Sequence, residues 1–153
     1  MLFITDHIFL RYNDNIYSSK FSYEIFNRYL KVFEQMTIVS RVKDVKDVKD
    51  IDGALLSSGA GINFEFMQNI SSFKSFLGPR KNARIKIEKI LDQHDFLIIR
   101  IPSQLGFLAA SIAENKKIKY GIEVVGCGWE AFWYYGSLTA KLYSFYTYFK
   151  MKS

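Results

Sequence analysis

The sequence predicts an α/β fold, because apolar runs typical of buried strands alternate with segments of helical periodicity between residues 2 and 125. Residues 95–101 (DFLIIRI) form the clearest strand, since a nearly continuous apolar run indicates burial on both faces, as in a parallel sheet. Ser103 suits the N-cap of the helix that follows, whose apolar stripe comprises Leu105, Leu108, Ala109, Ile112 and Ala113. This succession predicts a layered, mostly parallel sheet with right-handed crossovers.

The first third of the chain contributes two strands and a helix. Residues 2–5 and 8–10 are β-prone on either side of Asp6 and His7, which predicts a strand that bends or ends in a polar loop. Residues 13–15 (NDN) predict a turn. Ser22 suits the N-cap of a helix with apolar residues at positions 25, 26, 29, 30 and 33, and residues 36–42 predict the next strand.

The middle of the chain is less regular. Residues 42–50 are three Val-Lys-Asp triplets, a period that fits neither a strand nor a helix, so we expect a solvated loop. A Ser- and Gly-rich stretch at 53–61 precedes a short strand at 62–66. A helix over 80–93 has Ala83, Ile87, Ile90 and Leu91 on one face, and a last strand covers 120–125.

Length and composition fit one domain over residues 1–153. The single cysteine, Cys127, excludes an internal disulfide and suits a reducing cytoplasm, where we expect the protein. Cys127, His7 and His94 do not have the spacing of a structural zinc site, so no metal is expected. No apolar run approaches the roughly 18 to 20 residues of a membrane-spanning helix, and Asp6 interrupts a secretory signal.

The formal charge of +6 is concentrated in the second half of the chain. Residues 80–153 carry twelve Lys and Arg against six Asp and Glu, whereas residues 1–79 carry nine of each. This excess suits solubility, anionic lipid headgroups or a phosphate-bearing substrate. Nucleic acid is not an expected partner, because the basic residues are scattered and no binding signature is present.

Candidate binding residues follow the predicted strands, because ligands of open parallel sheets bind beyond the carboxyl ends of the strands. Helix or turn capping is the structural alternative for Asp6 and Ser103, as an ion pair is for Arg100. Glu130 and His7 are the candidates for proton transfer, and Cys127 is more typical of a buried filler than of a nucleophile. The candidates are Asp6, His7, Arg41, Arg100, Ser103, Glu123, Trp129 and Glu130.

Four segments together resemble a known family. Residues 21–33 (FSYEIFNRYLKVF), 38–42 (IVSRV), 100–103 (RIPS) and 123–133 (EVVGCGWEAFW) are similar in order and spacing to the N-terminal domain of family 4 glycosyltransferases, particularly those that assemble bacterial capsular polysaccharides or exopolysaccharides.

The resemblance implies a GT-B architecture, in which two Rossmann-like domains enclose a cleft. The first domain, three-layered with a mostly parallel sheet, holds the acceptor, and the second holds the nucleotide-sugar. Transfer in such enzymes is usually retaining, without a metal or another cofactor. No two glutamates of this chain lie eight apart, so the donor domain's E-x7-E motif is absent. The family's glycine-rich loop after the first strand is replaced by residues 11–15 (RYNDN), and its later histidine is not matched in residues 125–130.

The chain is therefore expected to be the acceptor-side half of a sugar-transferring enzyme, inactive without a C-terminal donor-binding domain. A nucleotide-sugar donor and a glycan or lipid-linked acceptor are the implied partners. A self-contained nucleotide enzyme is disfavoured, because the sequence lacks a phosphate-binding loop and a complete dinucleotide fingerprint. The alternatives are a non-catalytic binding or regulatory module, a subunit that works with a separately encoded donor half, and a pyruvyl- or phosphate-handling enzyme anchored by Arg100.

Residues 133–152 predict an aromatic helix with Leu138, Leu142, Phe145 and Phe149 on one stripe. Core packing or contact with the donor domain is one interpretation. Contact with an anionic membrane at the inner face is the other, since aromatic residues are interleaved with lysines. The residues assigned to this contact are Trp133, Tyr134, Lys141, Phe145, Phe149 and Lys150.

Overall fold

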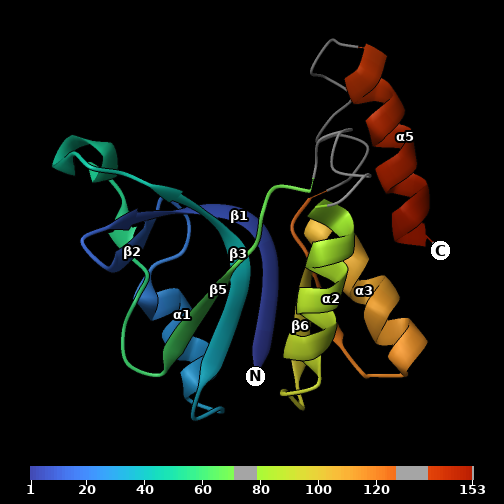
Figure 1. Ribbon diagram of the computed structural model, residues 1–153, viewed down its shortest axis with the longest axis horizontal. Coiled ribbons are helices and arrows are strands. Elements are labelled where there is room, and N and C mark those ends of the chain that lie inside the picture. The colour runs from blue at the N-terminus through green and yellow to red at the C-terminus, as the bar shows by residue number, and fades with distance from the viewer. Residues whose placement is uncertain (71–78, 127–137, 153) are drawn as a thin grey trace.

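The computed structural model describes residues 1–70, 79–126 and 138–152, and the described part has the predicted α/β class. A seven-stranded mixed sheet carries helices on both faces (Figure 1). The strands are β1 (Leu2–Tyr12), β2 (Asn15–Ser18), β3 (Met36–Asp44), β4 (Leu55–Leu56), β5 (Ile62–Phe66), β6 (Leu97–Ile101) and β7 (Gly121–Val124). The helices are α1 (Tyr23–Leu30), α2 (Pro79–Leu91), α3 (Gln104–Lys116) and α5 (Leu138–Lys152), with the 3-10 helix η1 at Val48–Ile51.

The sheet combines a parallel part with an antiparallel extension. The parallel strands run in the order β5, β3, β1, β6, β7. The strand β2 pairs antiparallel with the second half of β1, and β4 pairs antiparallel with β2. Along the edge of β1 opposite β3, residues 2–4 pair with β6 and residues 10–12 pair with β2. Thr5, Asp6 and His7 lie between these two pairings, where the register of β1 with β3 also shifts.

The antiparallel extension corrects two sequence-based expectations. The strand β1 continues to Tyr12 instead of ending near Asp6, because Asn13 and Asp14 adopt positive φ angles of 45° and 64° that turn the chain tightly into β2. The Val-Lys-Asp repeat is also not simply a solvated loop. Its first triplet completes β3, Val45 is buried, and η1 begins at Val48. The predicted, mostly parallel sheet is therefore a mixed one.

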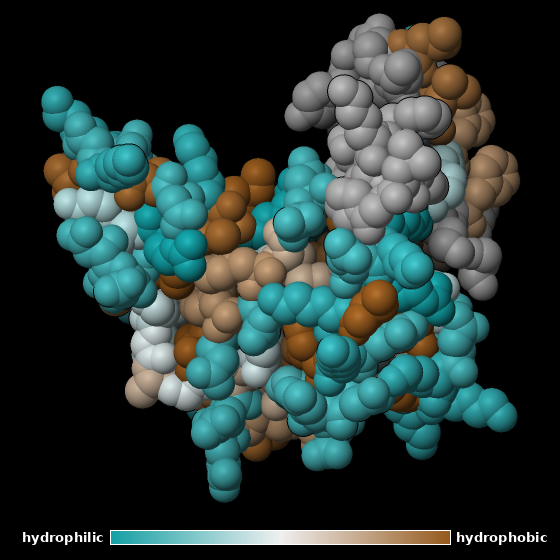
Figure 2. Space-filling view, viewed as in Figure 1, coloured by the Kyte–Doolittle hydropathy of each residue, from teal (hydrophilic) through white to brown (hydrophobic). Residues whose placement is uncertain are grey.

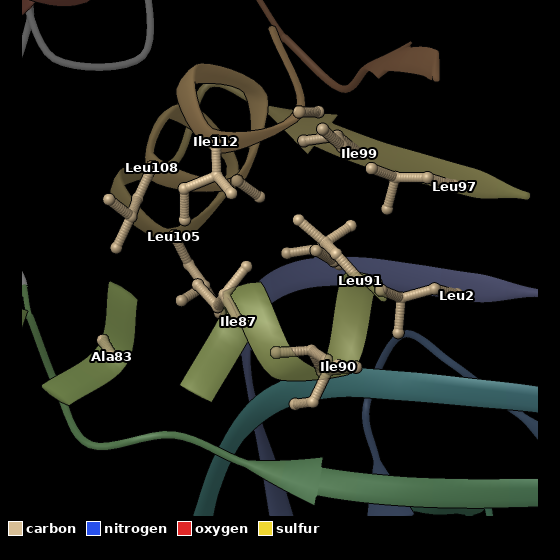
Figure 3. Packing of buried hydrophobic residues seen from close by; sticks show 14 of the residues in the cluster. Leu2, Ala83, Ile87, Ile90, Leu91, Leu97, Ile99, Leu105, Leu108 and Ile112 are labelled. Carbon is tan, nitrogen blue, oxygen red and sulfur yellow. The ribbon is translucent and has the colours of Figure 1, made fainter. Parts of the chain in front are cut away.

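Two apolar clusters lie on opposite faces of the sheet, as the alternating directions of Leu2, Phe3 and Ile4 require. One cluster packs α1 against Phe3 and its neighbours, with rings in edge-to-face contact. The other packs α2 and α3 against Leu2, Ile4 and β6 (Figure 3). The predicted apolar faces of both helices are confirmed, since every residue assigned to them is buried. The three layers support a rigid edge at the carboxyl ends of the parallel strands.

The start of α3 is fixed at that edge. The Ser103 hydroxyl accepts a hydrogen bond from the Gly106 N–H (2.9 Å) and donates one to the Arg100 carbonyl (3.0 Å), which confirms Ser103 as the N-cap. A Cβ atom at Gly106 would collide with the Arg100 carbonyl oxygen, so only glycine allows the helix to approach β6 this closely. The first turn of α3 thereby comes to lie beside the unpaired stretch of β1.

Candidate functional site

A cavity of about 650 Å³ opens beside the middle of β1 and β3 and at the carboxyl end of β6, where the pairing of β1 with β6 ends. Figure 2 shows the surface hollowed beside the part of the molecule that carries β2, β4 and η1. Residues from β1, the β2–α1 connection, β3, β6, the start of α3 and α5 line the cavity. They are Thr5, Asp6, His7, Lys20, Phe21, Arg41, Arg100, Pro102, Ser103, Val125 and Tyr143.

Asp6 and Arg41 form an ion pair at the base of this cavity. Arg41 Nε lies 2.7 Å from Asp6 Oδ1, and the guanidinium also donates hydrogen bonds to the Asp6 carbonyl. Burial raises the pKa of Asp6, an effect that the positive charge of Arg41 and the backbone N–H groups of Leu105 and Gln104 partly offset. The carboxylate thus occupies the N-terminus of α3, a position that a bound anion would otherwise favour, and ties β1 to β3 and α3.

His7 is held as a neutral imidazole by Ser18. The Ser18 hydroxyl accepts hydrogen bonds from the backbone N–H groups of Lys20 and Phe21, so its own proton is donated to His7 Nε2, 2.7 Å away. The proton of the ring must then lie on Nδ1. The pKa of His7 is lowered to about 4 by burial of the ring and by the nearby positive charges of Lys20, Arg100 and Arg41.

Arg100 stands at the wall between the cavity and a smaller one of about 210 Å³. Its guanidinium carbon lies 4.6 Å from the centre of the Phe21 ring, and Nε lies 2.7 Å from Glu123 Oε2. The Tyr29 hydroxyl donates a long hydrogen bond of 3.5 Å to the other carboxylate oxygen of Glu123. The geometry at the buried Nε is too bent for a hydrogen bond, and no described residue accepts one from the two terminal nitrogens.

The structure brings five predicted residues into one cavity, namely Asp6, His7, Arg41, Arg100 and Ser103. Glu123 is adjacent, in the smaller cavity, through its pair with Arg100. Trp129, Glu130, Cys127, Trp133 and Tyr134 lie outside the described residues.

Sequence reasoning missed Lys20, Phe21 and Tyr143. Lys20 and Phe21 precede the N-cap Ser22, and nothing in the sequence indicated the hairpin strand β2 that carries them to the middle of β1. Tyr143 reaches the cavity from α5, where Gln104 donates a hydrogen bond of 2.7 Å to its hydroxyl. In the sequence, the aromatic residues beside lysines in this helix indicated only a surface contact and gave no sign that Tyr143 would line a cavity.

The predicted apolar stripe of α5 is on the surface and is not part of the core. Leu138, Leu142, Phe145 and Phe149 are 42–76% exposed, whereas Ser144 and Thr147 on the other side of the helix are fully buried. This corrects the interpretation of the stripe as ordinary core packing. Lys141 is half-buried, and the side chain of Lys150 lies outside the described atoms.

Among residues 1–70, 79–126 and 138–152, no helix has the length and hydropathy needed to cross a membrane. Within the same ranges, no three His, Cys, Asp or Glu side chains are grouped as a metal site.

One curated protein is clearly similar to the chain. The chain is 37% identical over 144 residues to Protein CapJ of Staphylococcus aureus, in a match that covers 94% of this chain and 36% of that protein. The chain thus spans about a third of the length of this relative. No protein-family profile matches the chain, and no solved structure matches it.

Proposed function

We propose that this chain is the acceptor-binding half of a glycosyltransferase of capsule or exopolysaccharide synthesis. The observation that carries the proposal is the position of the cavity. The parallel strands run β5, β3, β1, β6, β7, an order in which the chain reverses its direction of travel across the sheet between β1 and β6. Open α/β sheets bind ligands at such a switch point, and the cavity lies there.

The same strand order is that of a Rossmann-like domain, which supports the GT-B half that the sequence resemblance implies. The similarity to CapJ supports a role in capsule synthesis, because the name CapJ suggests a capsule protein. The finding that the chain spans 36% of CapJ fits a unit that works with further polypeptide. In this proposal the nucleotide-sugar donor is bound by a second domain that faces the cavity.

The residues of the cavity would position the acceptor. Asp6 is already engaged by Arg41 and by α3, so it serves to shape the base of the site. His7 carries its proton on Nδ1 while Ser18 occupies Nε2, so it is suited to donate a hydrogen bond to an acceptor oxygen and not to remove a proton. Holding the acceptor hydroxyl against the anomeric carbon of the donor is a contribution of proximity and orientation.

We further propose that α5 contacts an anionic membrane. Its exposed stripe of Leu138, Leu142, Phe145 and Phe149 would enter the headgroup region, with Lys141 close to the lipid phosphates. Cosedimentation with vesicles should rise with the content of anionic lipid and fall in the double variant L142S/F149S. Cosedimentation that is independent of anionic lipid would instead point to the donor domain as the partner of this surface.

A transfer assay tests the main proposal. The chain is incubated with labelled nucleotide-sugars and a lipid extract, alone and together with a donor-binding polypeptide, and the label in glycan or lipid is measured. Transfer should require both polypeptides. Transfer by residues 1–153 alone would overturn the proposal. Binding of saccharide without transfer in the complete mixture would also overturn it and would favour a binding module.

A matched pair of substitutions links the transfer to the cavity. Val125 lines the cavity, and its neighbour Val124 does not, although both side chains are about half exposed. Tryptophan at position 125 adds bulk at the wall of the cavity without disturbing an ion pair, so V125W should lower transfer at least tenfold, whereas V124W should leave it unchanged. An equal loss in both variants would place the acceptor elsewhere.

A further inference from the structure

The cavity holds hydrogen-bond donors that the protein itself does not use. Lys20 extends from the β2–α1 connection, and no described residue forms an ion pair with its ammonium group. The terminal nitrogens of Arg100 likewise have no acceptor among the described residues, and its Nε is buried without a hydrogen bond. The Nδ1–H of His7 is the third donor, since Nε2 is taken by Ser18. These donors therefore remain available to a ligand in the cavity.

The three residues that carry these donors line the same large cavity. Lys20, Phe21 and Arg100 line both the large cavity and the smaller one, so they mark the junction between the two. The charges of Lys20 and Arg100 also act on the His7 ring, which places that ring within their electrostatic reach. The stacking on Phe21 and the contact with Glu123 hold the Arg100 guanidinium in place, which reduces the entropy lost when a ligand binds.

Nearby carboxylates do not satisfy these donors. Asp6 is paired with Arg41 and accepts from the start of α3. Glu123 pairs with Arg100 at Nε and is 38% exposed at its side chain. The Tyr143 hydroxyl accepts a hydrogen bond from Gln104 and adds no charge. The charged groups around His7 therefore give the site a net positive charge. An ammonium, a guanidinium and an imidazole N–H are the donors that a tetrahedral oxyanion accepts from most readily.

We propose that Lys20, Arg100 and the Nδ1–H of His7 bind a phosphate group of the ligand at the junction of the two cavities. The cavity of about 650 Å³ is much larger than one phosphate, so the group belongs to a larger molecule such as a phosphorylated sugar or a lipid-linked diphosphate. The identification of that molecule as the acceptor rests on the function proposed above. The phosphate site itself does not depend on sugar transfer.

Binding of inorganic pyrophosphate to the intact chain, measured by calorimetry, tests the site. K20Q and R100Q should each weaken binding at least tenfold. K31Q removes the same charge from an exposed lysine outside both cavities and should change binding less than twofold. R100K keeps the charge without the planar fork and should bind with intermediate affinity, which keeps the test valid if R100Q does not fold. No binding at millimolar pyrophosphate, or an equal loss in K31Q and K20Q, would overturn the proposal.

A second readout reports on His7 directly. Pyrophosphate should shift the NMR signals of the His7 ring and leave those of His94, which is bonded to Ile90 and Thr37, unchanged. Hexose 1-phosphate and vesicles that contain phosphatidic acid then distinguish a soluble from a lipid source of the phosphate, and each should depend on Lys20 and Arg100. Pyrophosphate binding without sugar transfer would refute only the proposed function. Conversely, the chain could bind no pyrophosphate and still transfer sugar in a way that V125W abolishes. That result would refute only the phosphate site.

Discussion

Replacement of His7 by glutamine is expected to change how the stability of the protein depends on pH. The pKa of His7 is about 4 in the folded chain and about 6.5 in the unfolded chain. As the pH falls, the unfolded chain therefore takes up this proton first. The stabilisation from a neutral His7 is fully present above pH 6.5 and is lost as the pH falls towards 4.

The size of the effect follows from the difference between the two pKa values. Each pKa unit corresponds to about 1.4 kcal/mol, which sets an upper limit of about 3 kcal/mol for His7. The ring is only half-buried, so screening by solvent should reduce this to about 1–2 kcal/mol. The side-chain amide of the H7Q variant would keep an acceptor for the Ser18 hydroxyl but would not titrate.

Urea denaturation followed by circular dichroism measures this difference between pH 7 and pH 4. The wild-type chain should lose about 1–2 kcal/mol more than H7Q over this range. Asp6, whose pKa is raised, titrates with the opposite sign, but it is present in both proteins and cancels in the comparison. Parallel stability curves for the two proteins, or an NMR titration of His7 with a midpoint near 6.5, would refute the reasoning.

Three further substitutions test the structure around the cavity. S103A removes the N-cap of α3 and should lower the free energy of unfolding by about 1 kcal/mol, measured in urea; no change would mean that Asp6 alone caps the helix. G106A places a Cβ against the Arg100 carbonyl and should cost about 2 kcal/mol or more, seen as a lower Tm, and an unchanged Tm would contradict the close approach of α3 to β6. R41M leaves the Asp6 carboxylate without its cation and should cost about 2 kcal/mol at pH 7, but less at pH 4, because burial raises the pKa of Asp6 and so favours the neutral carboxyl as the pH falls. An equal loss at both pH values would show that Arg41 acts through packing.

Local sequence signals predicted the elements whose residue pattern is visible along the chain. Residues 62–66 were expected as a strand and form β5, and Ser22 and Ser103 cap α1 and α3 as expected. The apolar faces of α2 and α3 could be assigned from spacing, because helical periodicity by itself decides which side chains share a face. The strands β2 and β4 have four and two residues, and only pairing with distant segments stabilises them. Their sequences therefore carried no strand signal of their own.

By itself, the sequence determined the α/β class, the order of the parallel strands along the chain and the polar residues that follow them. Tertiary structure alone decided which of those residues meet. β6 and β2 pair with the same edge of β1 at different positions along the strand, so Asp6 and His7 between them have no strand partner on that edge. The same arrangement brings Lys20 into one cavity with Arg100, 80 residues away in the sequence. Which strands lie side by side depends on contacts between distant segments, and periodicity along the chain reports only on neighbours a few residues apart.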